Sequence, residues 1–417
     1  MSAKEVLPSQ RVQTLPATYP EPSVPVVPVF DGVAVFARGR SDIPSVCDIS
    51  HVLYTSSGAA AIALALRHAG IGQGDEVLIP AYHCLSMVEP VQAVQARPVF
   101  YKVRADLSAD LSHLETKINK ATRALLATHY FGFPQDMAAI RALADRHGLR
   151  VIEDCAHAFF GLVQDRAVGT LGDYAIASAR KFFPIHDGGC LVSVRHPVEN
   201  LALRPGGLMF HMKAAVNIVE EAFVFGRARA LFILLGWPLR LKDVVWRALK
   251  PRADRESESS VGPTEGIEFR YFTPEHMDRA MSFPSRAIMA LSGKGRIVER
   301  RRGNYRRMVA GLSGLPNGRP LYDLLPENVV PYMVPFVIDQ PEIVFPVLKR
   351  LGVPIYRWET LATDGCSVSN DYAQRLLQLP CHPELREAEI DWMIACIRDA
   401  LSEANRGNRH GALPGNP

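Results

Sequence analysis

From about His51 onward, the sequence alternates short apolar runs with helix-like runs of about ten residues. The apolar runs are nearly continuous in hydrophobic residues, as strands are when both faces of a parallel sheet are covered. This alternation predicts an α/β fold with a mostly parallel central sheet. We expect strands in 77–80, 97–103, 123–131 and 149–158, and helices in 59–68, 84–96, 111–119 and 136–148.

In such sheets, ligands bind at the carboxyl ends of the strands. The polar residues after Val77–Pro80, Ala124–His129 and Val151–Asp154 are therefore the first candidates for a functional site. We expect them to lie along one edge of the sheet.

Charge and cysteine usage argue against several protein classes. The formal net charge is only +4, whereas a nucleic-acid-binding domain concentrates basic residues on one face. The seven cysteines form no CxxC pair, which argues against a disulfide framework and a zinc ribbon. The first ten residues lack the apolar centre of a signal peptide. We expect a cytoplasmic protein that binds neither nucleic acid nor metal.

Proline content and composition predict the organisation of the chain. Residues 1–30 hold six prolines and little periodicity, so we expect an extended arm that is ordered only where it docks. We expect a large α/β domain over 31–265, interrupted by a helical insert at about 208–250. A smaller C-terminal α/β domain over 266–405 and a disordered tail over 406–417 complete the prediction.

The insert has an apolar and basic character that admits three interpretations. Between Met212 and Leu235, apolar residues recur at helical spacing, and Gly236 and Pro238 then break the helix. A second short helix is expected up to Lys250. We favour a helical pair packed against protein, over a membrane-surface helix in 214–250 and over a disordered loop. The longest uncharged apolar run, 230–239, is too short to span a membrane.

The segment Tyr54–Ala59 places hydroxyl residues and a glycine directly before a helix. Free amides and the positive dipole end at such a helix start bind phosphate well. Serine and threonine are also the usual residues at helix N-caps, so both interpretations stay open from this segment alone.

The apolar run Val151–Asp154 ends in two carboxylates, and His157 follows three residues later. A carboxylate at a strand's carboxyl end can lie beneath a ligand and hold a proton or a cationic nitrogen. The alternative is an aspartate that caps a loop, with a solvated histidine beside it.

The segment Ser178–Lys181 lies between two predicted strands, and Phe182 and Phe183 follow it. Lysine is rarely buried without a partner. Burial lowers the pKa of an amine and makes it a nucleophile toward carbonyl groups. The alternative is a surface lysine whose stem alone is covered.

Together these segments resemble the DegT/StrS family of sugar aminotransferases, which have the type I fold of pyridoxal 5′-phosphate (PLP) enzymes. The resemblance runs from about Tyr54 to Val194 and returns at 379–401. Its most specific pieces are SSGAAAIALAL, GIGQGDEVLIP, THYFGFPQDM, HGLRVIEDCAHA and the stretch from Ser178 to Gly189.

The resemblance implies a role for each of these candidates. Lys181 would form the Schiff base with the cofactor aldehyde and act as the catalytic acid and base. Asp154 would keep the pyridine nitrogen protonated, so that the ring acts as an electron sink. His157 would lie near the ring oxygen.

The same resemblance implies a phosphate subsite at the helix start. The amides of Gly58, Ala59 and Ala60 would bind the cofactor phosphate, and Ser178 would add its hydroxyl. Two departures from the family pattern affect this region. Ser178 and Lys181 are three positions apart, whereas the family pattern has five.

The second departure concerns the residue that stacks on the cofactor ring. The position where the family has an aromatic residue falls on Cys84. Tyr82 is our candidate to replace it, with His83 as the alternative. A third interpretation is that this loop lines the site without contacting the cofactor.

The function implied by the resemblance is a PLP-dependent aminotransferase acting on a keto group of a nucleotide-activated sugar. The expected donor is an amino acid, glutamate in the first instance, and the pathway would build a polysaccharide or glycoconjugate. The expected assembly is a homodimer. Alternatives are a PLP-dependent sugar dehydratase, a transaminase for a non-sugar ketone, and a catalytically silent regulatory protein on this fold.

Other polar clusters have simpler interpretations. We expect His129 to have a structural role, although it could also contact the substrate. The segment Arg357–Glu359 could bind an anionic donor or a nucleotide, and a surface patch is the plainer interpretation. The arginines at 300–302, 306 and 307 lie on a predicted helix, where a solvated charged face is the usual explanation.

Overall fold

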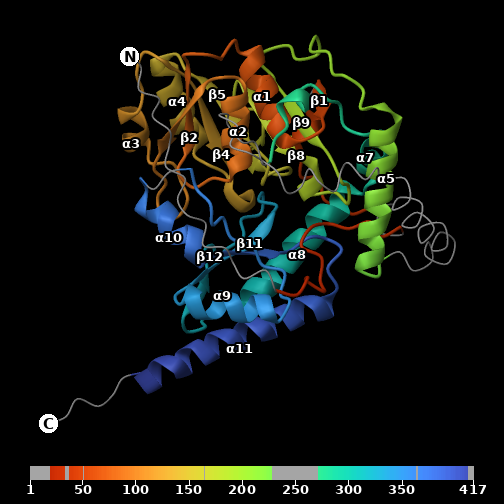
Figure 1. The fold of residues 1–417 in the computed structure, drawn as a ribbon, viewed down its shortest axis with the longest axis vertical. Coiled ribbons are helices and arrows are strands. Elements are labelled where there is room, and N and C mark those ends of the chain that lie inside the picture. Colours follow the sequence, from red (N-terminus) through yellow and green to blue (C-terminus); the bar gives the residue numbers. More distant parts are fainter. Residues whose placement is uncertain are drawn as a thin grey trace, which may run out of the picture.

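The computed structural model describes residues 19–32, 37–49, 51–163, 165–227, 271–362 and 365–411, with side chains as far as residue 405. Figure 1 shows a large sheet with its helices in one part and a small sheet with the C-terminal helices in the other.

Seven strands form the large sheet in the order β1-β9-β8-β5-β4-β2-β3. They are β1 (Val52–Thr55), β2 (Glu76–Pro80), β3 (Arg97–Tyr101), β4 (Thr122–Thr128), β5 (Arg150–Asp154), β8 (Tyr174–Ser178) and β9 (Gly189–Val192). From β3 to β8 all pairings are parallel, while β9 runs antiparallel to both of its neighbours. The predicted α/β class with a mostly parallel sheet is confirmed.

Helices cover both faces of this sheet. Successive residues of β2 point to opposite sides, so Val77 packs with α1 (Gly58–His68) and α2 (Leu85–Ala93). Leu78 packs instead into the cluster that contains α3 (Leu111–Thr116) and α4 (Met137–His147). This two-sided burial explains why the strands read as continuous apolar runs.

Several shorter elements accompany the seven-stranded sheet. They are the 3-10 turns η2 (Val46–Asp48), η3 (Tyr130–Gly132), η4 (Ala179–Lys181) and η6 (Pro274–His276), and the small ribbon β6 (Leu162–Val163) with β7 (Arg166–Ala167).

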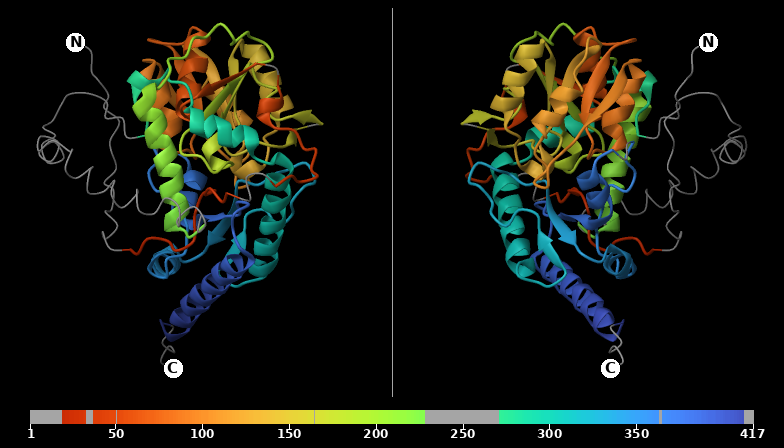
Figure 2. Two further views of the ribbon diagram at one scale, coloured as in Figure 1. Left: turned by 90° about the vertical axis from the view of Figure 1, so that its right-hand side faces the viewer. Right: turned by 90° about the vertical axis from the view of Figure 1, so that its left-hand side faces the viewer.

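The small sheet is antiparallel, in the order β10 (Gly318–Pro320), β11 (Met333–Ile338) and β12 (Leu376–Pro380). Three helices share its hydrophobic core: α8 (Lys294–Leu312), α9 (Pro341–Arg350) and α11 (Glu387–Gly411), and α10 (Ser367–Arg375) leads into β12. Figure 2 shows α11 projecting from this part toward the C-terminus. The helix reaches Gly411 because no proline interrupts it before Pro414, so the expected disordered tail begins at least six residues too early.

Part of the proline-rich arm docks on the small sheet. Val24 belongs to the hydrophobic core of that sheet, and the Nε2 atom of His382 lies 2.8 Å from the carbonyl oxygen of Pro25. The arm is thus held at Val24 and Pro25, and residues 1–18 lie outside the described chain.

The predicted insert begins with α5 (Gly207–Val224), which packs against α7 (Phe283–Leu291). The predicted helix over Met212–Leu235 is wrong in its bounds, because Gly226 adopts a left-handed φ of 61° and ends the helix. Its buried stripe is Ala214, Ile218 and Ala222.

A partly buried ion pair between Arg227 and Glu389, at 2.6 Å, ties the end of this segment to α11. The second predicted helix falls in 228–270, outside the described residues. Within the described ranges, no helix is both long and apolar enough to cross a membrane.

A glycine turn brings β9 against the start of α1. The amide of Gly188 donates to the carbonyl of Ser56 at 2.9 Å, and the carbonyl of Gly188 accepts from Ala179 at 3.0 Å. A Cβ atom at Gly189 would lie 2.2 Å from the carbonyl carbon of Ser57. Only glycine allows this approach, which joins the loop before α1 to the loop after β8.

We predict that Gly189→Ala lowers the urea midpoint of unfolding by the equivalent of about 1–3 kcal/mol, because the added methyl group overlaps backbone atoms. Gly303→Ala is the matched control, since its position in α8 has no atom within 4 Å. Alanine there should stabilise the helix by up to about 1 kcal/mol. Equal midpoints for the two variants would contradict the close approach.

Candidate active site

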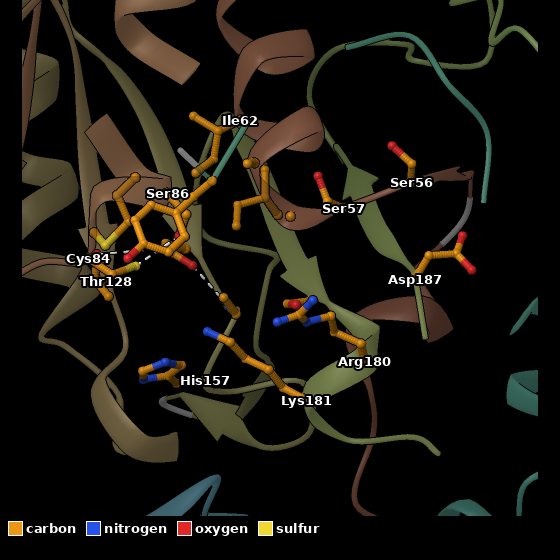
Figure 3. Close-up of a pocket in the computed structure, with 18 of the residues that line it drawn as sticks. Ser56, Ser57, Ile62, Cys84, Ser86, Thr128, His157, Arg180, Lys181 and Asp187 are labelled. Atoms are coloured by element: carbon orange, nitrogen blue, oxygen red, sulfur yellow. Dashed lines mark hydrogen bonds between the residues drawn. The ribbon is translucent and has the colours of Figure 1, made fainter. Parts of the chain in front are cut away.

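A cavity of about 380 Å³ opens at the carboxyl ends of β4, β5 and β8, beside the N-terminus of α1 (Figure 3). Its lining combines serine hydroxyls, two carboxylates, two cationic side chains and aromatic rings. The polar members include Ser56, Ser57, Thr128, Asp154, His157, Ser178, Arg180, Lys181, His186 and Asp187. The expected gathering of polar residues at this edge is therefore present in the structure.

The helix start at the cavity has unused amide groups. Ser57 is the N-cap of α1, and its hydroxyl accepts from the amide of Ala60 at 3.1 Å. No described residue accepts a hydrogen bond from the amides of Gly58 or Ala59, and both residues line the cavity. The prediction for Ala60 is corrected, because its amide is already bonded to Ser57 and the residue is not part of the lining.

Ser178 lies next to the helix start. A Cβ atom at Gly58 would contact Cβ of Ser178 at 3.5 Å, so the serine occupies the space beside the glycine. The resulting cradle holds two free amides and one hydroxyl around the positive end of a helix. This set suits a phosphate group.

Asp154 ends β5 and is buried, with 2% of its surface exposed. One carboxylate oxygen accepts from the amide of Ala156 at 2.9 Å, and the other lies 3.5 Å from the hydroxyl of Thr128. Burial raises the pKa of Asp154, although the amide of Ala156 and the charge of Lys181 oppose that rise. A cationic ligand group beside it would favour the ionised form.

Lys181 ends η4 and points into the cavity, with His157 on one side and Arg180 on the other (Figure 3). Burial lowers the pKa of its amine, and the positive charge of Arg180 lowers it further. The neighbouring Asp154 and Cys84 partly oppose this change. A larger share of neutral amine at a given pH makes Lys181 a better nucleophile.

His157 is buried between aromatic rings. Its ring centroid lies 4.5 Å from that of Tyr332 and 5.5 Å from those of Phe131 and Trp358. Burial and the charge of Lys181 hold its pKa well below the ordinary value, so the ring is neutral. Nδ1 accepts from the amide of Phe131 at 3.4 Å, which leaves Nε2 as the donor.

Tyr82 does not reach the cavity, so the structure contradicts its prediction as the stacking residue. It is fully buried behind the lining, where its ring packs on Trp358 at 4.8 Å. His83 is also buried, between Pro80 and the amide of Ala362. In this loop only Cys84 faces the cavity. The aromatic residues of the lining are instead Phe210, Tyr271 and Trp358, the last from the segment we had assigned to a surface patch.

Sequence reasoning missed Arg180, whose exposed side chain lines the cavity and makes no ion pair with a described residue. In the sequence, only its position next to Lys181 could have indicated that Arg180 lines the site. Asp187 also lines the cavity, but its carboxylate is occupied. It accepts hydrogen bonds from the hydroxyls of Ser282 and Ser285, each at 2.5 Å.

His129 has the structural role that we expected. Its Nε2 lies 3.0 Å from Glu153, and its Nδ1 accepts from the amide of Gln135 at 3.0 Å. Glu153 also accepts from the amides of Gly169, Leu171 and Gly172. His129, Glu153 and Cys155 could together hold a metal ion, since their polar atoms lie within 4.8 Å of one another. The polar atoms of His129 and Glu153 are, however, already used in hydrogen bonds.

Residues 42–202 match the model of the DegT/DnrJ/EryC1/StrS aminotransferase family. This match covers less than half of the chain. The resemblance deduced from the motifs is thereby confirmed, and the matched range contains Gly58, Asp154 and Lys181.

Curated relatives resemble the same region. The chain is 37% identical over 167 residues to UDP-N-acetyl-3-dehydro-alpha-D-glucosamine 3-aminotransferase of Acidithiobacillus ferrooxidans, covering 38% of this chain and 44% of the relative. It is 35% identical over 170 residues to GDP-perosamine synthase of Vibrio cholerae, covering 40% and 46%. The matches thus span less than half the length of either relative.

The fold match extends further. The PLP form of a putative sugar aminotransferase from Streptococcus pneumoniae superposes with a TM-score of 0.62. The superposition covers 91% of this chain and 99% of that one at 16% identity. This likeness shows that the described part of the chain shares the fold of that protein.

The charges around Lys181 predict how its amine titrates. Because Asp154 raises the pKa of Lys181 and Arg180 lowers it, Asp154→Asn should move the midpoint to lower pH and Arg180→Gln to higher pH. The measurement is the pH dependence of acetylation of Lys181 by acetic anhydride, followed by mass spectrometry. Shifts in the same direction for both variants would contradict the described electrostatics.

Proposed function

We propose that the chain is a PLP-dependent aminotransferase that converts a keto group of a nucleotide-activated sugar to an amine. The observation that carries the proposal is the arrangement of one cavity. The Lys181 amine, the Asp154 carboxylate and the free amides of Gly58 and Ala59 all face it. The names of the curated relatives support a nucleotide-sugar substrate, and an amino acid, first of all glutamate, is the proposed donor.

The residues present fit the cofactor. The cradle beside Ser178 would hold the phosphate, and Asp154 would hold the proton of the pyridine nitrogen. That contact also gives the buried carboxylate of Asp154 a cationic partner, which would offset the burial that raises its pKa. The neutral ring of His157 would donate from Nε2 to the ring oxygen.

When bound, PLP supplies an electron sink that stabilises negative charge at the carbon bearing the amino group. The protein provides the proton transfers. The Nζ atom of Lys181 would take a proton from the carbon of the amino-acid donor and would deliver a proton to the sugar carbon that gains the amine. Burial lowers the pKa of this amine, which favours the neutral form needed to accept a proton. Asp154 would hold a proton on the pyridine nitrogen and so keep the ring electron-withdrawing.

Covalent attachment of the cofactor tests the assignment of Lys181. Added PLP should give the native chain a visible absorbance band, and borohydride should fix the cofactor to Lys181 in peptide maps. Lys181→Ala should lose both. Cofactor fixed to another lysine of the native chain would refute the assignment.

Turnover tests the role of Asp154. In assays with glutamate and a panel of nucleotide keto-sugars, Asp154→Asn should bind PLP yet react at least about 100-fold more slowly. This corresponds to losing about 3 kcal/mol of electrostatic stabilisation. A near-native rate would rule out the proton-holding role.

We also propose a homodimer. Leu208, Met209 and Met212 of α5 are exposed by 73%, 63% and 52%, and Phe210 beside them lines the cavity. An apolar face next to the site suits burial against a second copy.

Light scattering should show that the native chain is a dimer, and the double substitution Leu208→Glu with Met212→Glu should dissociate it. Leu324→Glu, at an exposed position away from α5, should leave it intact. A monomeric native chain with full activity would refute the proposal.

A further inference from the structure

Arg301 is the largest fully buried side chain among the described residues. We had expected a solvated charged face here, and that prediction is wrong for both Arg301 and Arg302. Their guanidinium groups turn inward because backbone carbonyls replace water as hydrogen-bond acceptors. Arg301 donates to Pro331 at 3.3 Å, to Tyr332 at 2.8 Å and to Lys181 at 2.6 Å.

No described carboxylate forms an ion pair with Arg301. Its charge is compensated by the three carbonyl dipoles and by the face of Phe182, whose ring centre lies 4.4 Å from the guanidinium carbon. A buried charge with this arrangement is costly to keep for packing alone. Its three acceptors come from two segments that are far apart in sequence.

Both segments help to place the amine of Lys181. One bond holds the carbonyl of Lys181 itself. Another holds the carbonyl of Tyr332, whose ring centre lies 5.2 Å from the Nζ atom of Lys181 and 4.5 Å from the ring of His157. Arg301 thus fixes the lysine backbone and the aromatic surface against which the lysine side chain lies.

The local chain holds Lys181 only weakly. Within η4 and its cap, the amides of Phe182 and Phe183 both bond to the carbonyl of Ala179, and no other described donor reaches the carbonyl of Lys181. Only two residues separate Ser178 from Lys181, so the loop has little length with which to hold itself. The anchor comes from outside, from α8.

We propose that Arg301 is a positioning residue, which fixes the backbone of Lys181 so that its amine reaches the cavity at a set depth and orientation. The proposal rests on the proposed function in taking Lys181 as the reactive amine. A small displacement of a reacting group is enough to slow a reaction strongly. Removing Arg301 should therefore slow the reaction of Lys181 more than it lowers the stability of the fold.

Arg302 provides a matched control. It is the next residue of α8, is 8% exposed, and also donates to backbone carbonyls, those of Pro326 and Val329. It makes no described contact with η4. Arg301→Met and Arg302→Met each remove a buried guanidinium and its carbonyl bonds, but only the first releases Lys181.

The main measurement is the rate at which PLP becomes fixed to Lys181, trapped with borohydride and normalised to folded protein. Arg301→Met should slow it by at least about tenfold. Arg302→Met should stay near native, although both variants lower the urea midpoint. Arg301→Lys keeps the charge and one donor, so it should recover part of the rate. Equal rates for Arg301→Met and Arg302→Met would overturn the proposal.

Two further measurements apply if Arg301→Met does not fold or if the native chain does not bind PLP. If Arg301→Met does not fold, Arg301→Lys and Arg302→Lys replace the pair, and equal rates for these two overturn the proposal. If the native chain does not take up PLP, the proposed function fails. Acetylation of Lys181 in cofactor-free protein then tests Arg301 alone. Because a released amine gains water, Arg301→Lys should shift the midpoint to higher pH, and no shift relative to Arg302→Lys contradicts the anchor.

Discussion

The approach of the Gly188–Gly189 turn to the start of α1 is the contact on which the site depends. Two backbone hydrogen bonds of Gly188 join the loop before α1 to the loop after β8. A side chain at Gly189 would separate them, because its Cβ would overlap Ser57. Without this approach, the free amides of Gly58 and Ala59 and the amine of Lys181 would not face the same cavity.

Burial then gives the functional groups of the cavity their character. It raises the pKa of Asp154 and lowers the pKa of Lys181, so each group is pushed toward its neutral form. The same burial strengthens every interaction that a charged ligand would make there. The cavity therefore combines a ready nucleophile with a carboxylate that would be stabilised by a cationic partner.

Local patterns in the sequence predicted the features that depend on local physics. Strand–helix alternation identified the parallel sheet, since residues such as Val77 and Leu78 must both be buried on opposite faces. Asp154 and Lys181 followed from their places at the ends of apolar strands. Ala60 could not be judged in this way, because the choice of amide by Ser57 depends on a side-chain rotamer. Tyr82 lies in a loop without periodicity, where a shift of two residues decides which side chain faces the cavity.

The burial of Arg301 could not be predicted from the sequence for a different reason. In the sequence it belongs to a run of arginines on a helix, which normally faces solvent. Its burial depends on carbonyl groups 30, 31 and 120 residues away, which no local pattern records. The same holds for Trp358, which reaches the cavity wall from a distant segment.

The contacts that flank residues 228–270 have a consequence for how such chains can diversify. On one side, Arg227 is fastened to Glu389. On the other, the amide of Tyr271 bonds to Glu89, and Ser282 and Ser285 fasten the start of α7 to Asp187 of the glycine turn. Because both flanking ends are secured separately to the described part of the chain, a change in length or sequence between them over evolutionary time need not disturb the geometry of the cavity.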